Sequence, residues 1–151
     1  MKQPLKLQVK RLNENAILPT RAQFDDAGLD LYSSDSVFIP YGSSGKIPTG
    51  ISVATPSGTY IQIADRSSMA VKGLRTGAGV VDSQFRGGLT VIIHNLNNAT
   101  ESYIGERGYW VKKGDKIAQM ISIPILLPEV EEVSELSETS RGHNGFGSSG
   151  R

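Results

Sequence analysis

Apolar and polar residues alternate with a period of two along several short stretches of the chain. The period is present at residues 5–10, 60–63, 89–93 and, less regularly, 117–123. Such alternation is typical of strands with one buried and one exposed face. Shorter apolar stretches follow at residues 29–32, 36–39 and 51–54. The sequence therefore predicts a protein built mainly from short strands.

Clusters of Gly, Pro and Ser separate these stretches and predict turns, as at residues 40–45 and 56–58. Short strands at this spacing are typical of a sandwich, a jelly roll or a small barrel. The only expected helix is Ser67–Lys72, with a serine N-cap and Gly73 as its stop. We therefore expect an all-β domain with one short helix.

The end of the chain differs in composition. Residues 129–138 contain five glutamates, and the chain becomes rich in Gly and Ser from Ser140 onward. Burial cannot order a segment with so few apolar side chains. We expect a β domain at residues 1–138 and a mobile, glycine-rich arm at 139–151.

Composition and charge narrow the possible functions. The 151 residues fit one domain, and 16 Lys and Arg against 15 Asp and Glu give a net charge of +1, which favours neither nucleic acid nor a membrane as partner. The chain has no cysteine, which excludes thiol chemistry, and only two scattered histidines, which predict no metal cluster. No signal peptide or membrane span is visible in the pattern. We expect a soluble intracellular protein, cytoplasmic or nuclear.

The segment Thr76–Gly88 combines glycines, an acid and an aromatic residue in a way that fits a hairpin. Its glycines would let the backbone approach a flat ligand closely, while Phe85 packs on a sugar or ring. Asp82, between Val81 and Ser83, would be partly desolvated and suited to act as a general base. An ordinary glycine-rich hairpin with a turn-forming Asp is the alternative.

Three further places carry polar groups that need partners. Arg66-Ser67-Ser68, at the start of the expected helix, suits phosphate oxygens, although a plain helix start explains it equally well. Gln119 lies among branched apolar residues, and its partner is either a ligand phosphate or a backbone group of a neighbouring strand or subunit. Asp30 lies in an apolar strand and, if buried, needs a cation or several donors, for which Arg66 is a natural candidate; a turn at the end of the strand is the alternative.

The glycine-rich arm lacks the Gly-Lys-Ser/Thr ending of a phosphate-binding P-loop. Its Arg141, Phe146 and hydroxyl residues Ser148 and Ser149 would instead suit a lid that closes over a nucleotide. A disordered tail without function is the alternative.

Five segments in one order carry a resemblance that none of them carries alone. They are residues 27–34, 66–70, 79–87, 114–119 and 141–150. Through them the chain resembles the trimeric deoxyuridine triphosphatase (dUTPase) family. The resemblance implies a jelly-roll-like distorted β-barrel or sandwich, the dUTPase-like β-clip. It also implies a homotrimer with active sites at its subunit interfaces, each closed by the arm of another subunit.

The resemblance further implies the hydrolysis of dUTP to dUMP and pyrophosphate, which limits uracil in DNA and supplies dUMP for thymidylate synthesis. Asp82 would be the base that activates a water for attack on the α-phosphorus. Mg²⁺ would be held through the substrate phosphates and waters and not directly by side chains. The implied phosphate-binding residues are Arg66, Ser67, Ser68 and Gln119, with Asp30 as the structural support of Arg66.

For the nucleoside, the resemblance implies that the main chain at Gly79 and Val80 reads uracil and that Phe85 packs on the deoxyribose. The implied lid consists of Arg141, Phe146, Gly147, Ser148 and Ser149. Phe146 would stack on the uracil.

Some residues depart from the family pattern. They are Asp65 for Pro, Ser68 for Gly, Gln84 for Asp, Phe85 for Tyr and Lys116 for Arg. An added acid or Cβ near the phosphates would weaken binding. The alternative function is therefore a catalytically weak or inactive homologue that binds a nucleotide or a protein. A dCTP deaminase, a relative with the same fold, is disfavoured because residues 90–94 offer no glutamate.

Overall fold

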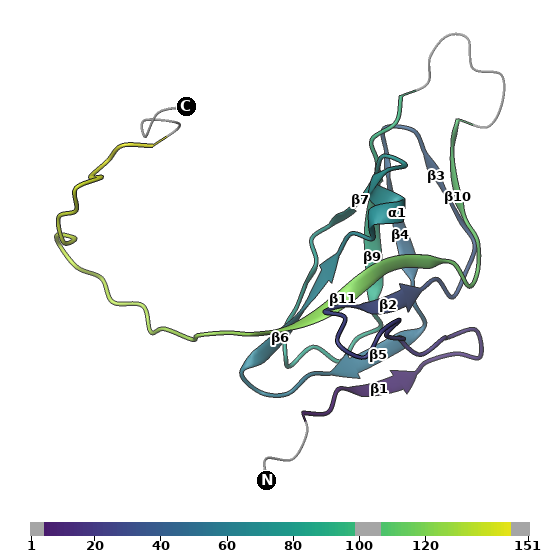
Figure 1. The fold of residues 1–151 in the computed structure, drawn as a ribbon, viewed down its shortest axis with the longest axis horizontal. Coiled ribbons are helices and arrows are strands. Elements are labelled where there is room, and N and C mark those ends of the chain that lie inside the picture. Colours follow the sequence, from purple (N-terminus) through teal and green to yellow (C-terminus); the bar gives the residue numbers. More distant parts are fainter. Residues whose placement is uncertain (1–4, 99–106, 146–151) are drawn as a thin grey trace.

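Short antiparallel strands build the body of the protein (Figure 1). The computed structural model describes residues 5–98 and 107–145. The elements are β1 (Gln8–Arg11), β2 (Leu29–Tyr32), β3 (Val37–Pro40), β4 (Ser44–Pro48), β5 (Ile51–Ala54), β6 (Thr59–Ala64), α1 (Ser67–Ala70), β7 (Leu74–Gly77), β8 (Val80–Val81), β9 (Thr90–Asn95), β10 (Gly108–Val111) and β11 (Lys116–Pro124).

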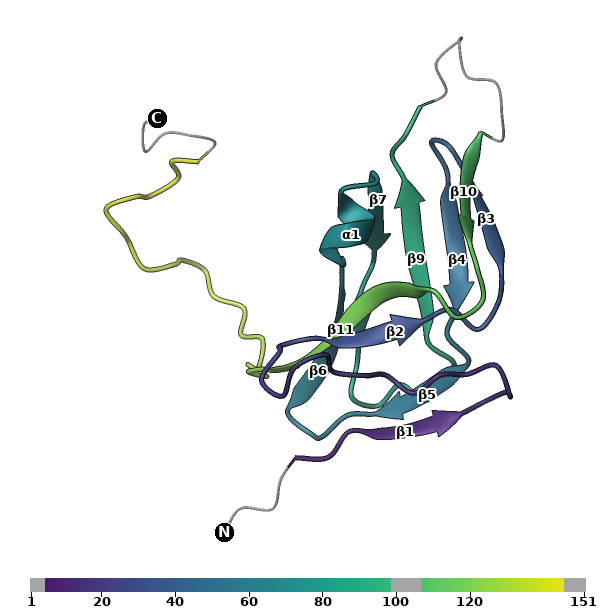
Figure 2. The same cartoon turned by 45° about the vertical axis from the view of Figure 1, so that its right-hand side comes forward.

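Two larger sheets and two strand pairs share these strands. One sheet has the order β2-β11-β6-β8 and the other β4-β9-β7, while β1 pairs with β5 and β3 with β10. Figure 2 shows β9 between β4 and β7, with β2 and β11 crossing in front of this sheet. Every pairing is antiparallel, and the described strands form no closed barrel. The predicted all-β class with one short helix is confirmed.

Aliphatic side chains from all the main strands fill the core. In β9, Val91 and Ile93 are each 1% exposed, whereas Thr90 is exposed and Ile92 half-buried. This is the alternation that the sequence predicts for residues 89–93. The fully buried aliphatic side chains include Leu31, Ile39, Ile47, Ile51, Ile61, Leu74 and Met120.

The irregular pattern at 117–123 has a structural cause. The register of β11 against β2 shifts between Lys116 and Ala118, which is a β-bulge. Because the bulge turns two successive residues toward the core, Ile117 and Ala118 are both buried. Simple alternation predicts that Ile117 and Gln119 share one face of the strand. The bulge places Ile117 in the core instead.

The helix is shorter than expected and begins differently. Its N-cap residue is Arg66, without a side-chain capping bond, so the predicted serine N-cap is wrong. Gly73 has a φ of 73° and donates its N–H to the carbonyl of Ala70, which confirms it as the stop. No described helix has the length and apolar composition to cross a membrane.

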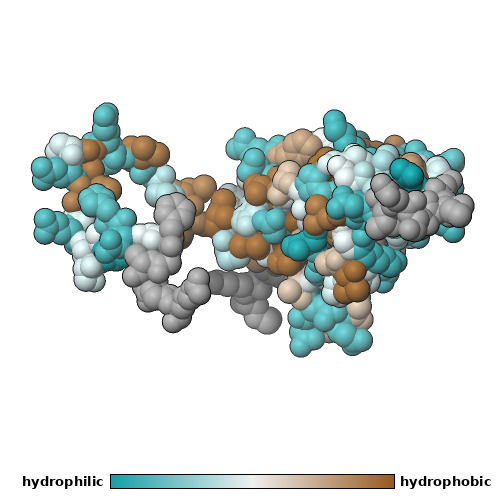
Figure 3. Space-filling model, turned by 90° about the horizontal axis from the view of Figure 1, so that it is seen from above, coloured by the Kyte–Doolittle hydropathy of each residue, from teal (hydrophilic) through white to brown (hydrophobic). Residues whose placement is uncertain are grey.

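After β11 the chain leaves the body (Figure 1). The described residues from Ile125 to Gly145 form neither strand nor helix, so the departure begins well before residue 139. Figure 3 shows apolar side chains that stay uncovered along this departing segment. Leu126 is 93% exposed, Val130 100% and Leu136 87%.

Candidate active site

The segment 76–88 crosses between the two larger sheets. Strand β7 pairs with β9 whereas β8 pairs with β6, and no described ladder joins β8 to β7 or β9. The crossing takes place at Ala78 and Gly79, whose φ angles are 55° and 102°. The predicted hairpin is present, since β7 pairs antiparallel with β9, but it splits open toward its tip, where two successive residues with positive φ redirect the outgoing strand to β6.

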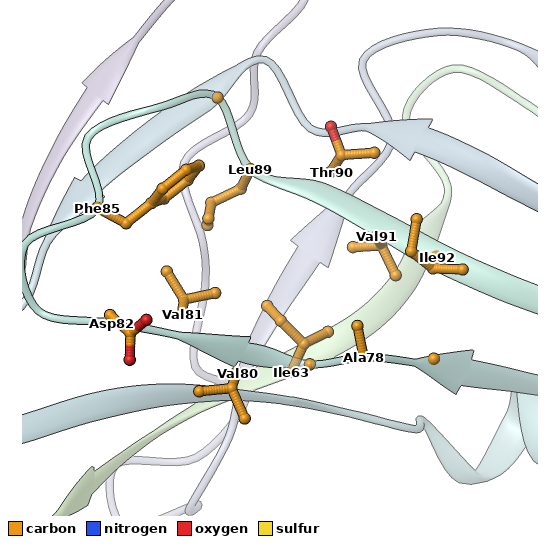
Figure 4. Close-up of a pocket in the computed structure, with 13 residues that line it drawn as sticks. Ile63, Ala78, Val80, Val81, Asp82, Phe85, Leu89, Thr90, Val91 and Ile92 are labelled. Atoms are coloured by element: carbon orange, nitrogen blue, oxygen red, sulfur yellow. The ribbon is translucent and has the colours of Figure 1, made fainter.

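A cavity of about 230 Å³ opens where β8 and the first half of β9 diverge. Figure 4 shows Val80 and Val81 on one side and Leu89 and Val91 on the other, with Ile63 of β6 beside the first pair. The lining is mainly aliphatic. Such a slot suits the flat faces of a small ring, and its edges are the main chains of two strands.

Backbone N–H and C=O groups of β8 that do not bond to β6 face this cavity. Ile63 donates its N–H to the carbonyl of Gly79 at 2.7 Å, so Gly79 faces β6. Successive residues of a strand alternate in direction, and the N–H and C=O of Val80 therefore face away from β6. A Cβ on Gly79 would lie 2.8 Å from the carbonyl oxygen of Ile63, so only glycine fits there.

Asp82 and Phe85 stand at the two ends of one tight turn beside the cavity. The N–H of Phe85 donates to the carbonyl of Asp82 at 3.0 Å. The Phe85 ring lies against Gly87, where a Cβ would be 2.5 Å from Cζ, and the side chain is 45% exposed. Asp82 is exposed, so the predicted partial desolvation does not occur within a single chain.

A second group of predicted residues surrounds Asp30. Arg66 Nε lies 3.0 Å from Asp30 Oδ1, and Lys116 Nζ lies 2.7 Å from Oδ2. Burial raises the pKa of Asp30, but the hydrogen bond from Lys116 and the charge of Arg66 outweigh burial and hold this pKa below its ordinary value. The same contact raises the pKa of Lys116. The predicted Asp30–Arg66 pair is present, and Lys116 is a second cation that the sequence did not assign to it.

The hydroxyls at the helix start have different environments. Arg66 donates from Nη1 to Ser68 Oγ at 3.3 Å. The Ser67 side chain is exposed, and its hydroxyl has no partner among residues 5–98 and 107–145. Ser67 is thus available to a ligand, whereas Ser68 is already engaged in its own chain.

Gln119 finds its partner within the chain. Its Nε2 donates to the carbonyl of Asp65 at 2.7 Å. Its Oε1 lies against Gly28, where a Cβ would be only 2.1 Å away. Of the partners considered for this amide, the single chain supplies a backbone group, which holds the side chain beside Arg66.

The predicted site residues thus form two groups and an arm. The cavity group contains Gly79, Val80, Asp82 and Phe85, and the other surrounds Asp30. Arg141 lies on the arm, where its Nε donates to the carbonyl of Asn144 at 2.9 Å. The remaining predicted lid residues, Phe146, Gly147, Ser148 and Ser149, lie outside the described residues.

Sequence reasoning missed several residues that line the cavity, among them Ile63, Thr90 and Val91. Their alternating pattern marks them as strand residues. It does not show that β9 keeps β4 but loses β7 as a partner at this point, because that depends on the crossing at Ala78.

Comparisons with known proteins agree on one family. Residues 14–150 match the sequence model of the dUTPase family. A deoxyuridine 5'-triphosphate nucleotidohydrolase of Oryza sativa subsp. japonica is 44% identical over 145 residues, covering 95% of this chain and 80% of that protein. One of Paramecium bursaria Chlorella virus 1 is also 44% identical over 145 residues, covering 95% and 97%. The solved structure of Staphylococcus bacteriophage 80alpha dUTPase with dUpNHpp has a TM-score of 0.88 at 31% identity, covering 97% of this chain and 99% of that one.

Fold and sequence together place the chain among the nucleotidohydrolases of deoxyuridine 5'-triphosphate. The chain belongs to the dUTPase family.

Proposed function

We propose that this chain hydrolyses dUTP to dUMP and pyrophosphate, with Asp82 as the general base. The observation that carries the proposal is the cavity between β8 and β9. There the main-chain edge of Val80, the ring of Phe85 and the carboxylate of Asp82 lie around one slot. Removal of dUTP in this way limits uracil in DNA and supplies dUMP for thymidylate synthesis.

The main chain of Val80 accounts for the choice of base. A strand residue offers one N–H and one C=O side by side, which matches the O4 acceptor and the N3–H donor of uracil. In the same orientation cytosine would bring its amino donor against the N–H, at the cost of an unpaired group. Phe85 would pack on the deoxyribose and leave no room for a ribose 2′-hydroxyl.

The chemical step needs a base at the mouth of this slot. Asp82 would take a proton from a water whose oxygen attacks the α-phosphorus. The bond from the α-phosphorus to the bridging oxygen then breaks, and pyrophosphate leaves with that oxygen. The exposure of Asp82 in the single chain is compatible with this role if another subunit and the substrate cover it.

The group around Asp30 is suited to the phosphates. The free hydroxyl of Ser67 and the main chain at Ser68 would bind phosphate oxygens. Arg66 and Gln119 are both held by neighbours in the chain, by Asp30 and by the carbonyl of Asp65. Their positions are thus fixed before a substrate arrives, which lowers the entropy cost of binding.

Mg²⁺ fits this chain as an ion that arrives with the substrate. No group of three His, Asp or Glu side chains that could hold a metal is found among the described residues. Mg²⁺ commonly keeps several waters and binds through substrate phosphates. Bound to the triphosphate, it would offset the negative charge of the pyrophosphate leaving group. A dUTPase mutant from phage phi11 of S. aureus has been solved with details of a structural Mg(II) ion.

A homotrimer with shared active sites would bring the two groups and the arm together. Within one chain the cavity by β8 shares no lining residue with the pocket beside Arg66 and Lys116. The arm leads away from both (Figure 1). We propose that residues 139–151 close the active site of another subunit, with Arg141, Phe146, Gly147, Ser148 and Ser149 over the nucleotide.

Subunit mixing tests this arrangement. Alone, Asp82→Asn should be nearly inactive, and a chain ending at Glu138 should be weakly active at low dUTP because its KM is raised. Refolded together, they should regain activity, because some sites then combine an intact Asp82 with an intact arm. Activity that stays at the sum of the two separate variants contradicts shared sites.

The reaction itself is tested by pyrophosphate release from dUTP with Mg²⁺, beside dCTP, dTTP and UTP. We expect release selective for dUTP and lost in Asp82→Asn. Asp26→Asn removes an exposed carboxylate outside both groups and should keep full activity. Binding of dUTP without turnover would instead establish the alternative, a nucleotide-binding homologue.

A further inference from the structure

Asp65 connects three elements at the junction of β6 and α1. Its Oδ1 accepts hydrogen bonds from the N–H of Thr76 at 2.6 Å and from Thr76 Oγ1 at 2.9 Å. Its Oδ2 forms an ion pair with Nε of Arg75. Its own carbonyl accepts the bond from Gln119 of β11. One half-buried residue thus ties together the end of β6, the middle of β7 and a candidate phosphate residue.

The bonds to β7 lie immediately before the wall of the cavity. Thr76 is followed by Gly77, Ala78 and Gly79, all of which line it. Ala78 has a φ of 55°, which is strained for a residue with a side chain. Such a conformation persists only when contacts on both sides hold it. Here Asp65 holds the chain before Ala78, and the bond from Ile63 to Gly79 holds it afterward.

The negative charge of Asp65 is balanced within the chain by Arg75. Burial raises the pKa of this carboxyl, but the hydrogen bonds from Thr76 and the contact with Arg75 outweigh burial and hold the pKa below its ordinary value. Asp65 is therefore ionised at neutral pH, and its charge is matched by Arg75. The weakening of phosphate binding expected from an acid at this position has no basis in this geometry, because both carboxylate oxygens face β7.

We propose that Asp65 is a positioning residue for base recognition: by holding Thr76 and Arg75, it sets the path of Gly77–Val80 and hence the edge that reads uracil. This inference rests on the proposed hydrolysis of dUTP. The Asp65 side chain touches neither base nor phosphate in this account and acts only through β7. The selectivity for the base should therefore depend on it.

The test is the ratio of kcat/KM for dUTP to that for dCTP, measured on one preparation of each variant. This ratio does not depend on the fraction of correctly folded enzyme. In Asp65→Ala the ratio should fall about tenfold or more, mainly through a higher KM for dUTP. Asp65→Asn keeps an acceptor for Thr76, so the ratio should fall less in this variant. Thr76→Val loses only the hydroxyl bond and should also show a partial fall.

Thr55→Val is the matched control for stability. It removes the hydrogen bond between Thr55 and Thr59, away from the cavity, and should lower the Tm without changing the ratio. If the Asp65 and Thr76 variants lower the Tm while the ratio stays at the wild-type value, Asp65 is only structural and the inference is wrong. A wild-type chain without preference for dUTP would contradict the proposed function itself, which is a distinguishable result.

Discussion

Asp30 and Arg66 lie 36 residues apart in the sequence and form an ion pair with 3.0 Å between Oδ1 and Nε. The Asp30 side chain is 16% exposed and the Arg66 side chain 27%. Each side chain therefore stabilises the charge of the other, because a half-buried ion without a partner costs folding free energy. Arg66 directly precedes Ser67, so this pair fixes the start of the proposed phosphate-binding group.

Asp30→Asn should lower the free energy of unfolding at neutral pH by about 1.5–3 kcal/mol, since charged hydrogen bonds are lost. The folded pKa of Asp30 is depressed. Its contribution is therefore fully present above the unfolded pKa of about 3.9 and is lost as the pH falls through the lower folded value. Urea unfolding of both chains across this range should show the difference shrinking in acid. A difference that is constant with pH contradicts this assignment.

Gly79→Ala should lower the free energy of unfolding by about 1–3 kcal/mol and strongly raise the KM for dUTP. The reason is a clash of the new Cβ with the Ile63 carbonyl beside the cavity. Gly58→Ala is the control, because Gly58 also has a positive φ, of 76°, but no atom lies within 4 Å of its Cβ position. It should cost some stability and leave the kinetics unchanged. Equal KM values for the two variants would exclude close backbone approach at Gly79.

Phe85→Ala should raise the turnover of UTP relative to dUTP by about 10–100-fold, because the ring no longer excludes the 2′-hydroxyl. Phe85→Tyr should keep the discrimination, since stacking needs only the ring. Phe24→Ala removes a 99% exposed aromatic residue outside the site and serves as the control. Competition kinetics with mixed dUTP and UTP give the ratio directly. Unchanged discrimination in Phe85→Ala would place sugar recognition elsewhere.

A chain ending at Glu138 should fold with an unchanged Tm, because the described arm residues after this point are exposed. Its KM for dUTP should rise by about tenfold or more, since a lid that excludes water strengthens the polar contacts beneath it. Calorimetry and steady-state kinetics on the same sample separate the two effects. A lower Tm with unchanged KM would assign the arm to stability alone.

Much of the fold could be predicted from the alternation of apolar and polar residues. The strands that this pattern did not predict show where it fails. Residues 44–45 read as part of a turn because of Gly45, yet they begin β4. This strand position holds a glycine because a Cβ at Gly45 would lie 2.7 Å from the Ile39 side chain. Gly108 of β10 likewise leaves no room for a Cβ beside Phe38. A glycine required by packing looks the same in the sequence as a glycine required by a turn.

The candidate site likewise contains contacts that could be predicted from the sequence and contacts that could not. The Asp30–Arg66 pair could be predicted because an acid in an apolar strand needs a cation. The second cation, Lys116, depends on the bulge at the start of β11 and was not assigned. The crossing at Ala78 could not be predicted either, because it depends on β7 and β8 pairing with two different strands, β9 and β6.

The central claim is that water, activated by Asp82, attacks the α-phosphorus. Turnover of dUTP in water enriched in heavy oxygen tests this claim most directly, with both products analysed by mass spectrometry. The account predicts one heavy oxygen in dUMP and none in pyrophosphate. Heavy oxygen in pyrophosphate instead would mean attack on the β-phosphorus and would contradict the account.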